Sequence, residues 1–259
     1  MNFNLPHLPS RTAKPRSNGL TMVMDKGLSL GEAEHLIESG QNIIDVVKLG
    51  FGSAVVTPRV DEKIKRYQQA GFAVYFGGTL FESFIARDML DEYIRLLEKL
   101  GIQHAEVSDG SLEIDHDVKL TYISRLAKNF TVFSEVGSKD AEKIIPPYKW
   151  IAQMKSELEA GAWKVIAEAR EGGNVGIYRG TGEVRSGLVE EILTQIDAEK
   201  ILWEAPNKAQ QIYFIKLLGA DVNLGNIATN DVIPLETLRL GLRGDTLVFM
   251  LRQQGIEVA

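Results

Sequence analysis

The sequence of 259 residues contains no cysteine. Disulfide bonds, thiolate metal sites and redox chemistry through protein thiols are therefore excluded. The remaining composition, with 44% hydrophobic and 25% charged residues, is that of a globular protein with enough apolar material for a core. Because a cysteine-free chain tolerates a reducing compartment, we expect a cytoplasmic protein.

Long apolar stretches are missing as well. The first residues, MNFNLPHLPSRTAKPRSNG, lack the apolar region of a signal peptide, and no run of about 18 apolar residues occurs elsewhere. We therefore expect a protein that is neither exported by a signal peptide nor inserted in a membrane. The net charge of -6 has both signs interspersed, whereas nucleic-acid-binding proteins concentrate basic residues, so no nucleic-acid partner is expected.

Nucleotide-binding loops of the GxGxxG or Walker type are also absent. The sequence instead repeats one unit, a short run of β-forming apolar residues followed by a stretch with helical periodicity. The apolar runs lie at residues 20–27, 43–51, 72–79, 104–110, 131–137, 164–171, 200–206 and 221–227. The helical stretches are clearest at residues 60–71, 81–101, 149–162, 183–196 and 207–219, and several of them end in glycine.

These strand-then-helix units predict the fold class. Eight of them in a chain of this length indicate an α/β protein, a single-domain (β/α)8 TIM barrel. An open doubly wound sheet of that size would usually carry a recognisable nucleotide loop. No linker divides the chain, so we expect one barrel domain over residues 18–259, with residues 1–17 forming either a tail or a cap on the barrel.

The ends of the strand-like runs are unusually polar. In a TIM barrel, these C-terminal strand ends carry the catalytic groups. They offer Asp25 and Lys26, Lys48, Gly77 with Gly78 and Thr79, Glu106 with Ser108 and Asp109, Glu135 with Lys139, Glu168 with Arg170 and Glu171, Glu204, and Asn223 with Asn226. Each charge taken alone can equally well begin a solvated loop. Eight polar ends together predict a mouth lined by charge.

A mouth holding both carboxylates and basic side chains suits a divalent metal and an anionic, oxygen-rich substrate. Alternate side chains of a strand share a face, so Val46 goes with Lys48, and Phe133 with Glu135. The four histidines have no metal-ligand spacing with one another. Oxygen ligands without cysteine or clustered histidine favour Mg2+ over zinc, and acid–base chemistry then falls to lysine or to carboxylates.

Two glycine-bearing strand ends, "YFGGTLFE" and "VNLGNI", allow the backbone to approach a ligand. The loop after the eighth strand belongs to the usual phosphate site of such barrels. We predict that Asn223, Asn226 and Arg243 bind a phosphate group. Arg239 is the weaker candidate, because we expect it to face solvent on a helix. The alternative is that these glycines are ordinary turn residues.

The motifs, taken in order, resemble one known family. The matching pieces are "KPRSNGLTMVMDKG", "DVVKLGFGSA", "YFGGTLFE", "AEVSDGS", "SEVGSKD", "LEAGAWKVIAEAREGG", "WEAPNKAQQ", "VNLGNIA" and "LETLRLGLRGDT". They run collinearly from residue 14 to residue 247. So long a set is far more specific than any one motif, and the chain resembles the phosphosulfolactate synthases.

The resemblance implies a (β/α)8 barrel and a Mg2+-dependent addition of sulfite to phosphoenolpyruvate. The product is (2R)-phospho-3-sulfolactate, so the reaction forms a carbon–sulfur bond and the enzyme is a lyase. In methanogenic archaea this product feeds coenzyme M biosynthesis, and in some spore-forming bacteria it leads to sulfolactate. The sequence does not choose between these two pathways.

The resemblance also gives a role to the stretch "TVFSEVGSKD", where a buried strand ends in acid, glycine and base. It implies that Glu135 lies at the metal and that Lys139 is the proton donor, since family proposals place the acid on a lysine of this motif. Lys48 is the rival acid, or a clamp for sulfite. For the metal we predict Glu106, Glu135 and Glu168 as ligands. Two further predictions are Asp25 and Glu204 as partners of those ligands, and Arg170 as a contact for sulfite or a substrate carboxylate.

One departure from the family is visible. The loop after "EVGSKD" is short, whereas archaeal members carry a longer insertion and a second lysine in place of Ser138, so substrate gating can differ. Two other functions stay open, a C–C synthase of the aldolase type and a non-catalytic relative, such as the plant heat-stress protein with a role in protein quality control. The charged strand ends favour an enzyme. Exposed aromatic helices are compatible with a homo-oligomer, whose interface the sequence does not locate.

Overall fold

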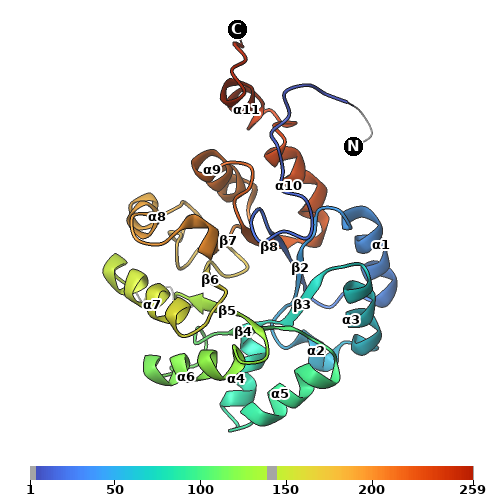
Figure 1. Ribbon diagram of the computed structural model, residues 1–259, viewed down its shortest axis with the longest axis vertical. Coiled ribbons are helices and arrows are strands. Elements are labelled where there is room, and N and C mark those ends of the chain that lie inside the picture. The colour runs from blue at the N-terminus through green and yellow to red at the C-terminus, as the bar shows by residue number, and fades with distance from the viewer. Residues whose placement is uncertain (1–3, 139–144, 259) are drawn as a thin grey trace.

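Parallel strands occupy the centre of the molecule and helices surround them (Figure 1). The computed structural model describes residues 4–138 and 145–258. The strands are β1 (Thr21–Asp25), β2 (Val46–Leu49), β3 (Ala73–Phe76), β4 (His104–Val107), β5 (Thr131–Val136), β6 (Lys164–Ala167), β7 (Ile201–Glu204) and β8 (Leu224–Ala228). Each lies within or next to one of the apolar runs of the sequence, and the predicted (β/α)8 barrel is confirmed.

The strands form one sheet in the order β3-β2-β1-β8-β7-β6-β5-β4. Its two edges, β3 and β4, come together and leave the barrel nearly closed, although within residues 4–138 no ladder pairing joins them. A side chain bridges this seam instead. The backbone N–H of Gly78, just after β3, donates to Oε1 of Glu106 in β4 at 2.6 Å.

The inside of the barrel is packed with side chains from several strands. Met22, Val46, Tyr75, Phe133 and Ile166 form one buried cluster with Leu20 and Leu202, and side chains from these different strands can meet only on the barrel axis. The residues between them in sequence, such as Val23 and Val47, belong to a second cluster under the helices. Period-two alternation therefore sorts each strand into an axial face and a helix-covered face.

The helices surround the sheet. They are α1 (Leu30–Gly40), α2 (Ser53–Val56), α3 (Val60–Gln69), α4 (Gly78–Ile85), α5 (Leu90–Lys99), α6 (His116–Leu126), α7 (Pro147–Glu159), α8 (Ser186–Leu193), α9 (Lys208–Leu218), α10 (Val232–Arg239) and α11 (Leu247–Gln253), with short 3-10 turns at Ala198–Lys200 and Thr229–Asp231. The glycines after α3 and α5, Gly71 and Gly101, have φ of 80° and 65°, as a left-handed helix cap requires. No helix in the described parts of the chain is both long and apolar enough to cross a membrane.

Two predicted boundaries were wrong. The periodic stretch 81–101 is two helices, α4 and α5, because the chain turns at Asp88, where φ is 57°. The apolar stripe continues across this turn, so periodicity alone does not reveal it. The last strand begins at Leu224 rather than residue 221, because the preceding residues form a turn in which Val222 donates to the Gly219 carbonyl at 3.3 Å.

The N-terminal segment is tied to the end of the barrel where the strands begin. Arg11 pairs with Glu236 at 3.0 Å and with Asp221, and Arg16 pairs with Asp45 at 2.9 Å. These contacts anchor the segment before β1 beneath the barrel.

Candidate active site

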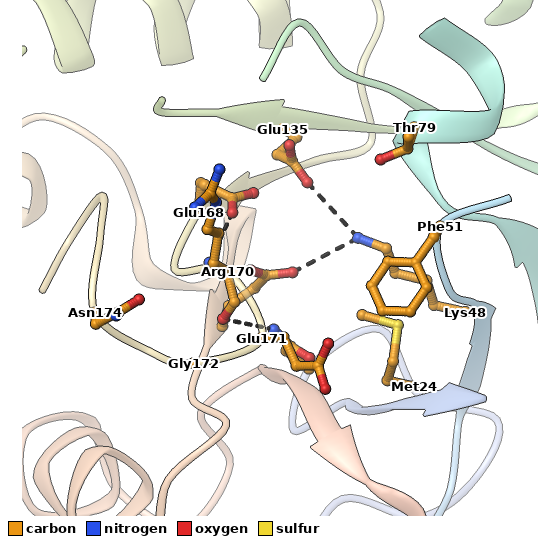
Figure 2. Close-up of a pocket in the computed structure, with 13 residues that line it drawn as sticks. Met24, Lys48, Phe51, Thr79, Glu135, Glu168, Arg170, Glu171, Gly172 and Asn174 are labelled. Carbon is orange, nitrogen blue, oxygen red and sulfur yellow. Dashed lines mark hydrogen bonds and ion pairs between the residues drawn. The ribbon is translucent and has the colours of Figure 1, made fainter. Parts of the chain in front are cut away.

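A pocket of about 410 Å3 opens at the C-terminal ends of the strands (Figure 2). Its lining combines carboxylates, two cations, amides and glycine backbone. The lining residues are Met24, Lys48, Phe51, Gly78, Thr79, Glu135, Glu168, Arg170, Glu171, Gly172, Asn174, Glu204 and Asn226. Among the described residues, charged side chains line the pocket from the ends of β2, β5, β6 and β7, so the prediction that charge gathers at this end of the barrel is confirmed for half of the strands.

Three carboxylates from neighbouring strands meet in this pocket. Glu135 ends β5, Glu168 follows β6 and Glu204 ends β7, and one oxygen of each lies within 4.8 Å of the others. All three are almost completely buried, with at most 2% of each residue exposed. Such an arrangement is costly unless cations neutralise it, so these carboxylates are suited to hold a metal ion.

Neighbouring groups hold each of these carboxylates in position. The backbone N–H of Arg170 donates to Glu168 Oε1 at 2.7 Å, and the N–H of Ala169 donates to Glu204 Oε2 at 3.1 Å. The Ser108 hydroxyl lies 3.0 Å from Glu135 Oε1. Their orientation is set by the fold, as a preorganised ligand set requires.

Lys48 supplies positive charge inside the ring of carboxylates. Its Nζ lies 2.8 Å from Glu106 Oε2 and 3.6 Å from both Glu135 Oε2 and Glu204 Oε1, and Figure 2 shows it pointing to Glu135 from the opposite wall. Burial lowers the pKa of Lys48, but Glu106 and the other acidic neighbours raise it by more, so the net pKa lies well above its usual value. Lys48 therefore stays protonated at neutral pH.

Glu106 has a different position from the one predicted. It does not join the triad, where Glu204 takes the expected place, because its carboxylate is turned to the β3–β4 seam. There it accepts from the Gly78 N–H at 2.6 Å and pairs with Lys48 at 2.8 Å. In the candidate triad Glu204 therefore stands where Glu106 was predicted, and Glu106 pairs with Lys48.

Asp25 also lies away from the triad. It points outward from β1 into the helical layer, where Lys63 of α3 pairs with its Oδ2 at 2.7 Å and Tyr67 donates to the same atom at 3.0 Å. Its other oxygen accepts from the N–H groups of Gly27 and Leu28. The prediction that Asp25 supports the metal ligands was wrong, because alternation places Met24, and not Asp25, toward the pocket.

Arg170 and Asn226 are brought together at the pocket, as their predicted roles require. Asn226 Nδ2 donates to the Arg170 carbonyl at 3.0 Å. Both residues have left-handed backbone, with φ of 55° and 57°. Strain of this kind persists where surrounding contacts hold it, and here it shapes the wall that carries Arg170.

The other two residues of the predicted phosphate group lie elsewhere. Asn223 precedes β8 at the opposite end of the barrel, where its amide donates to the carbonyls of Glu199 and Ile201, each at 3.1 Å. Arg243 lies between α10 and α11 in the outer helical layer and does not line the pocket. Arg239, expected to face solvent, is fully buried and donates to the Val222 carbonyl at 2.7 Å.

Some predictions and omissions concern single residues. Lys139, the predicted proton donor, lies outside the described residues.

Phe51 and Asn174 line the pocket but were not predicted, although each stands beside glycine in "LGFGS" and "EGGNVG", a weak signal for a ligand-facing loop. Glu82, on α4, was also missed. It is buried beside the segment that follows β4, where the Ser108 hydroxyl contacts Oε1 and the Ser111 N–H donates to Oε2 at 2.9 Å.

The chemistry of the donor set fits a hard cation. Three buried carboxylates provide the oxygen ligands that Mg2+ prefers, and none of the four histidines lines the pocket as described. The pocket therefore suits a divalent metal ion together with a small anionic substrate. Lys48 and Arg170 supply additional positive charge.

Comparisons with known proteins agree with this geometry. The sequence matches the family described as (2R)-phospho-3-sulfolactate synthase (ComA) over residues 9–245. It is 41% identical to a phosphosulfolactate synthase of Methanothermobacter thermautotrophicus over 92% of this chain and 95% of that protein. It is also 41% identical to a phosphosulfolactate synthase of Bacillus subtilis over 95% of this chain and 98% of that protein.

A solved structure supports the fold alone. The 3-hexulose-6-phosphate synthase of Salmonella typhimurium superposes with a TM-score of 0.55 at 17% identity, covering 91% of this chain and 99% of that chain. At such low identity the likeness carries no information about substrate.

Proposed function

Since the chain belongs to the (2R)-phospho-3-sulfolactate synthase family, we propose that it adds sulfite to phosphoenolpyruvate in a Mg2+-dependent reaction and releases (2R)-phospho-3-sulfolactate. The observation that carries this proposal is the buried triad of Glu135, Glu168 and Glu204 with Lys48 and Arg170 in one pocket. The product leads either to coenzyme M or to sulfolactate biosynthesis.

The bond changes balance without a redox partner or a leaving group. Sulfite supplies the electron pair of the new C–S bond at C3, the C2–C3 double bond opens toward C2, and one proton is delivered to C2. Negative charge therefore develops on the C2 side and spreads into the substrate carboxylate. A site for this reaction must bind anions, stabilise that charge and provide one acid.

Glu135, Glu168 and Glu204 would hold the Mg2+ ion. When bound, Mg2+ supplies Lewis-acid neutralisation of the carboxylate into which the charge spreads. Lys48 balances the remaining carboxylates from the opposite wall and attracts the anionic substrates, since its raised pKa keeps it protonated. Arg170, on the loop after β6, contacts sulfite or the substrate carboxylate, and Asn226 fixes its backbone.

The proton for C2 comes from Lys139 in this proposal, with Lys48 as the alternative donor. Lys139 follows Glu135 by four residues in the sequence, beyond the end of β5, so it is close in sequence to the triad. Lys48 is the rival because its ammonium points into the pocket. A high pKa does not prevent donation to a strongly basic carbanion, so pKa does not choose between the two.

The test is to incubate the protein with phosphoenolpyruvate, sulfite and Mg2+, with and without EDTA, and to follow the product by phosphorus NMR. We expect metal-dependent product that Lys139→Ala reduces by roughly 10²-fold or more, as for loss of a general acid. Lys149→Ala, which changes an exposed lysine of α7, is the matched control and should retain activity.

Each other outcome has a distinct meaning. Full activity in Lys139→Ala moves the acid to Lys48. Product that EDTA does not abolish contradicts the metal requirement. No product from the wild type contradicts the proposed reaction. A lysine adduct trapped by borohydride during turnover would instead indicate Schiff-base chemistry of the aldolase type.

A further inference from the structure

A buried cation lies behind the triad, outside the pocket. Lys119, on α6, is 1% exposed and pairs with Asp109 and with Glu157 of α7, each at 2.9 Å. Glu157 is fully buried, and its second oxygen accepts from the Ser134 hydroxyl of β5 at 2.6 Å. The network therefore joins two helices to the end of β5 and to the loop after β4.

The third contact of Lys119 is made with the backbone of a triad residue. Its Nζ donates to the Glu135 carbonyl at 2.6 Å. Carbonyls alternate sides along a strand, and the next one, of Val136, accepts from Glu168 on the β6 side. The Glu135 carbonyl therefore faces β4, whose pairing with β5 ends at Val107 and Ser134. Because β4 ends before it can donate a backbone N–H to this carbonyl, the Lys119 ammonium donates to it instead.

We propose that Lys119 is a positioning residue for the Glu135 carboxylate, and that it acts by holding the end of β5. This inference rests on the proposed metal site. Lys119 also fixes Asp109, one residue after Ser108, whose hydroxyl contacts Glu135 Oε1 at 3.0 Å. One buried ammonium thus sets both the backbone of Glu135 and the loop that contacts its side chain.

The chain provides a matched control in Lys63. This lysine of α3 is also 1% exposed, pairs with a buried carboxylate at a strand end, Asp25, at 2.7 Å, and donates to a backbone carbonyl, that of Leu28, at 2.8 Å. Neither Asp25 nor Leu28 lines the pocket. Loss of Lys63 should therefore cost comparable stability without affecting metal binding.

The experiment compares Lys119→Met with Lys63→Met, using Mn2+ as the metal probe without substrates. Free Mn2+ is measured by its electron paramagnetic resonance signal, and hydrogen exchange is followed in peptides that cover β1 and β5. For Lys119→Met we expect a rise of about tenfold in the Kd of Mn2+, typical for loss of a group that orients a metal ligand. We also expect faster exchange at the end of β5 but not in β1. Lys63→Met should show the reverse exchange pattern and an unchanged Kd.

Two further variants keep the test decisive. Lys119→Met leaves the fully buried Glu157 without its ammonium partner, so the double variant Lys119→Met with Glu157→Met, which removes both charges of this pair, replaces it if the single variant does not fold. Lys119→Arg should recover part of the Mn2+ affinity, because it restores a donor.

An unchanged Mn2+ affinity in the Lys119 variants would overturn the inference, even if β5 exchanged faster, since Lys119 would then be merely structural. Failure of the wild type to bind Mn2+ would instead contradict the metal site of the proposed function. In that case β5 exchange still decides whether Lys119 holds the strand.

Discussion

At the residue scale, the site depends on which carboxylates pair with Lys48 and which are placed to bind a metal ion. Lys48 lies 2.8 Å from Glu106 but 3.6 Å from Glu135 and Glu204, so Glu106 is its nearest partner. The other Glu106 oxygen accepts from the Gly78 N–H. Both Glu106 oxygens therefore have partners in the protein. Glu204 is paired as well, with Lys48 at 3.6 Å and with the Ala169 N–H at 3.1 Å, but one of its oxygens also lies within 4.8 Å of oxygens of Glu135 and Glu168. Membership of this group of three carboxylates separates Glu204, which is placed to bind a metal, from Glu106.

A pair of amide substitutions tests this separation. Glu204→Gln keeps an oxygen for the Ala169 N–H but removes a charge from the triad, so we expect the Kd of Mn2+ to rise at least tenfold. Glu106→Gln keeps an oxygen for the Gly78 N–H and should leave that Kd within about twofold while lowering kcat, because Lys48 loses its nearest carboxylate. Equal loss of Mn2+ affinity in both variants would return Glu106 to the set of metal ligands.

At the scale of elements, the loop between β6 and α8 carries Glu168 and Arg170 into the pocket. Its path depends on close backbone packing at Gly176, where φ is 64° and an added Cβ would lie 2.0 Å from the Glu168 carbonyl oxygen. Only glycine fits here without moving Glu168. Gln210 of α9 donates to the Gly173 carbonyl at 2.8 Å and to the Gly182 carbonyl at 3.1 Å, so these two hydrogen bonds tie the loop to α9.

Two glycines in this loop give opposite predictions. Gly176→Ala should lower the free energy of unfolding by about 2 kcal/mol or more and weaken Mn2+ binding, because the clash displaces Glu168. Gly180→Ala has nothing within 4 Å of the added Cβ and should change stability by less than about 0.5 kcal/mol. Urea unfolding and Mn2+ titration check both. Similar effects of the two substitutions would show that the loop tolerates movement at Gly176.

At the scale of the whole molecule, the two ends of the barrel have different tasks. The C-terminal end holds the pocket, while the N-terminal end is closed by Arg11, Arg16 and the buried Arg239, which pair with acids or donate to backbone carbonyls. His104 also lies toward that end, at the start of β4. Burial lowers the pKa of its imidazole below the ordinary value.

The lowered pKa of His104 predicts acid sensitivity of the fold. Below pH of about 6.5 the unfolded chain takes up a proton that the folded protein resists, so the free energy of unfolding falls as the pH drops. The slope from this one group is at most about 1.4 kcal/mol per pH unit. Urea midpoints between pH 7 and pH 5 should fall less steeply in His104→Gln than in the wild type. His35→Gln, at an exposed position of α1, is the control, and an equal slope in all three proteins would contradict the prediction.

The repeat of strand and helix, the barrel that follows from it, and the polar character of the strand ends could all be predicted from the amino-acid sequence. These depend on local period and composition, which a linear sequence carries directly. Glu135, Glu168, Arg170 and Asn226 were found in this way because each ends an apolar run and lines the pocket. The family motifs added the reaction to be tested.

Tertiary structure decided which of the polar ends share one space. Asn223 was misplaced because β8 begins at Leu224, after a turn that the apolar pattern does not reveal. Asp25 was misplaced because alternation relates neighbours on one strand but does not say which face looks inward. Glu106 lies outside the candidate triad, at the β3–β4 seam, where it accepts from the Gly78 N–H and pairs with Lys48 of β2. Such contacts follow from how the strands are staggered when the barrel closes, which involves residues far apart in the sequence.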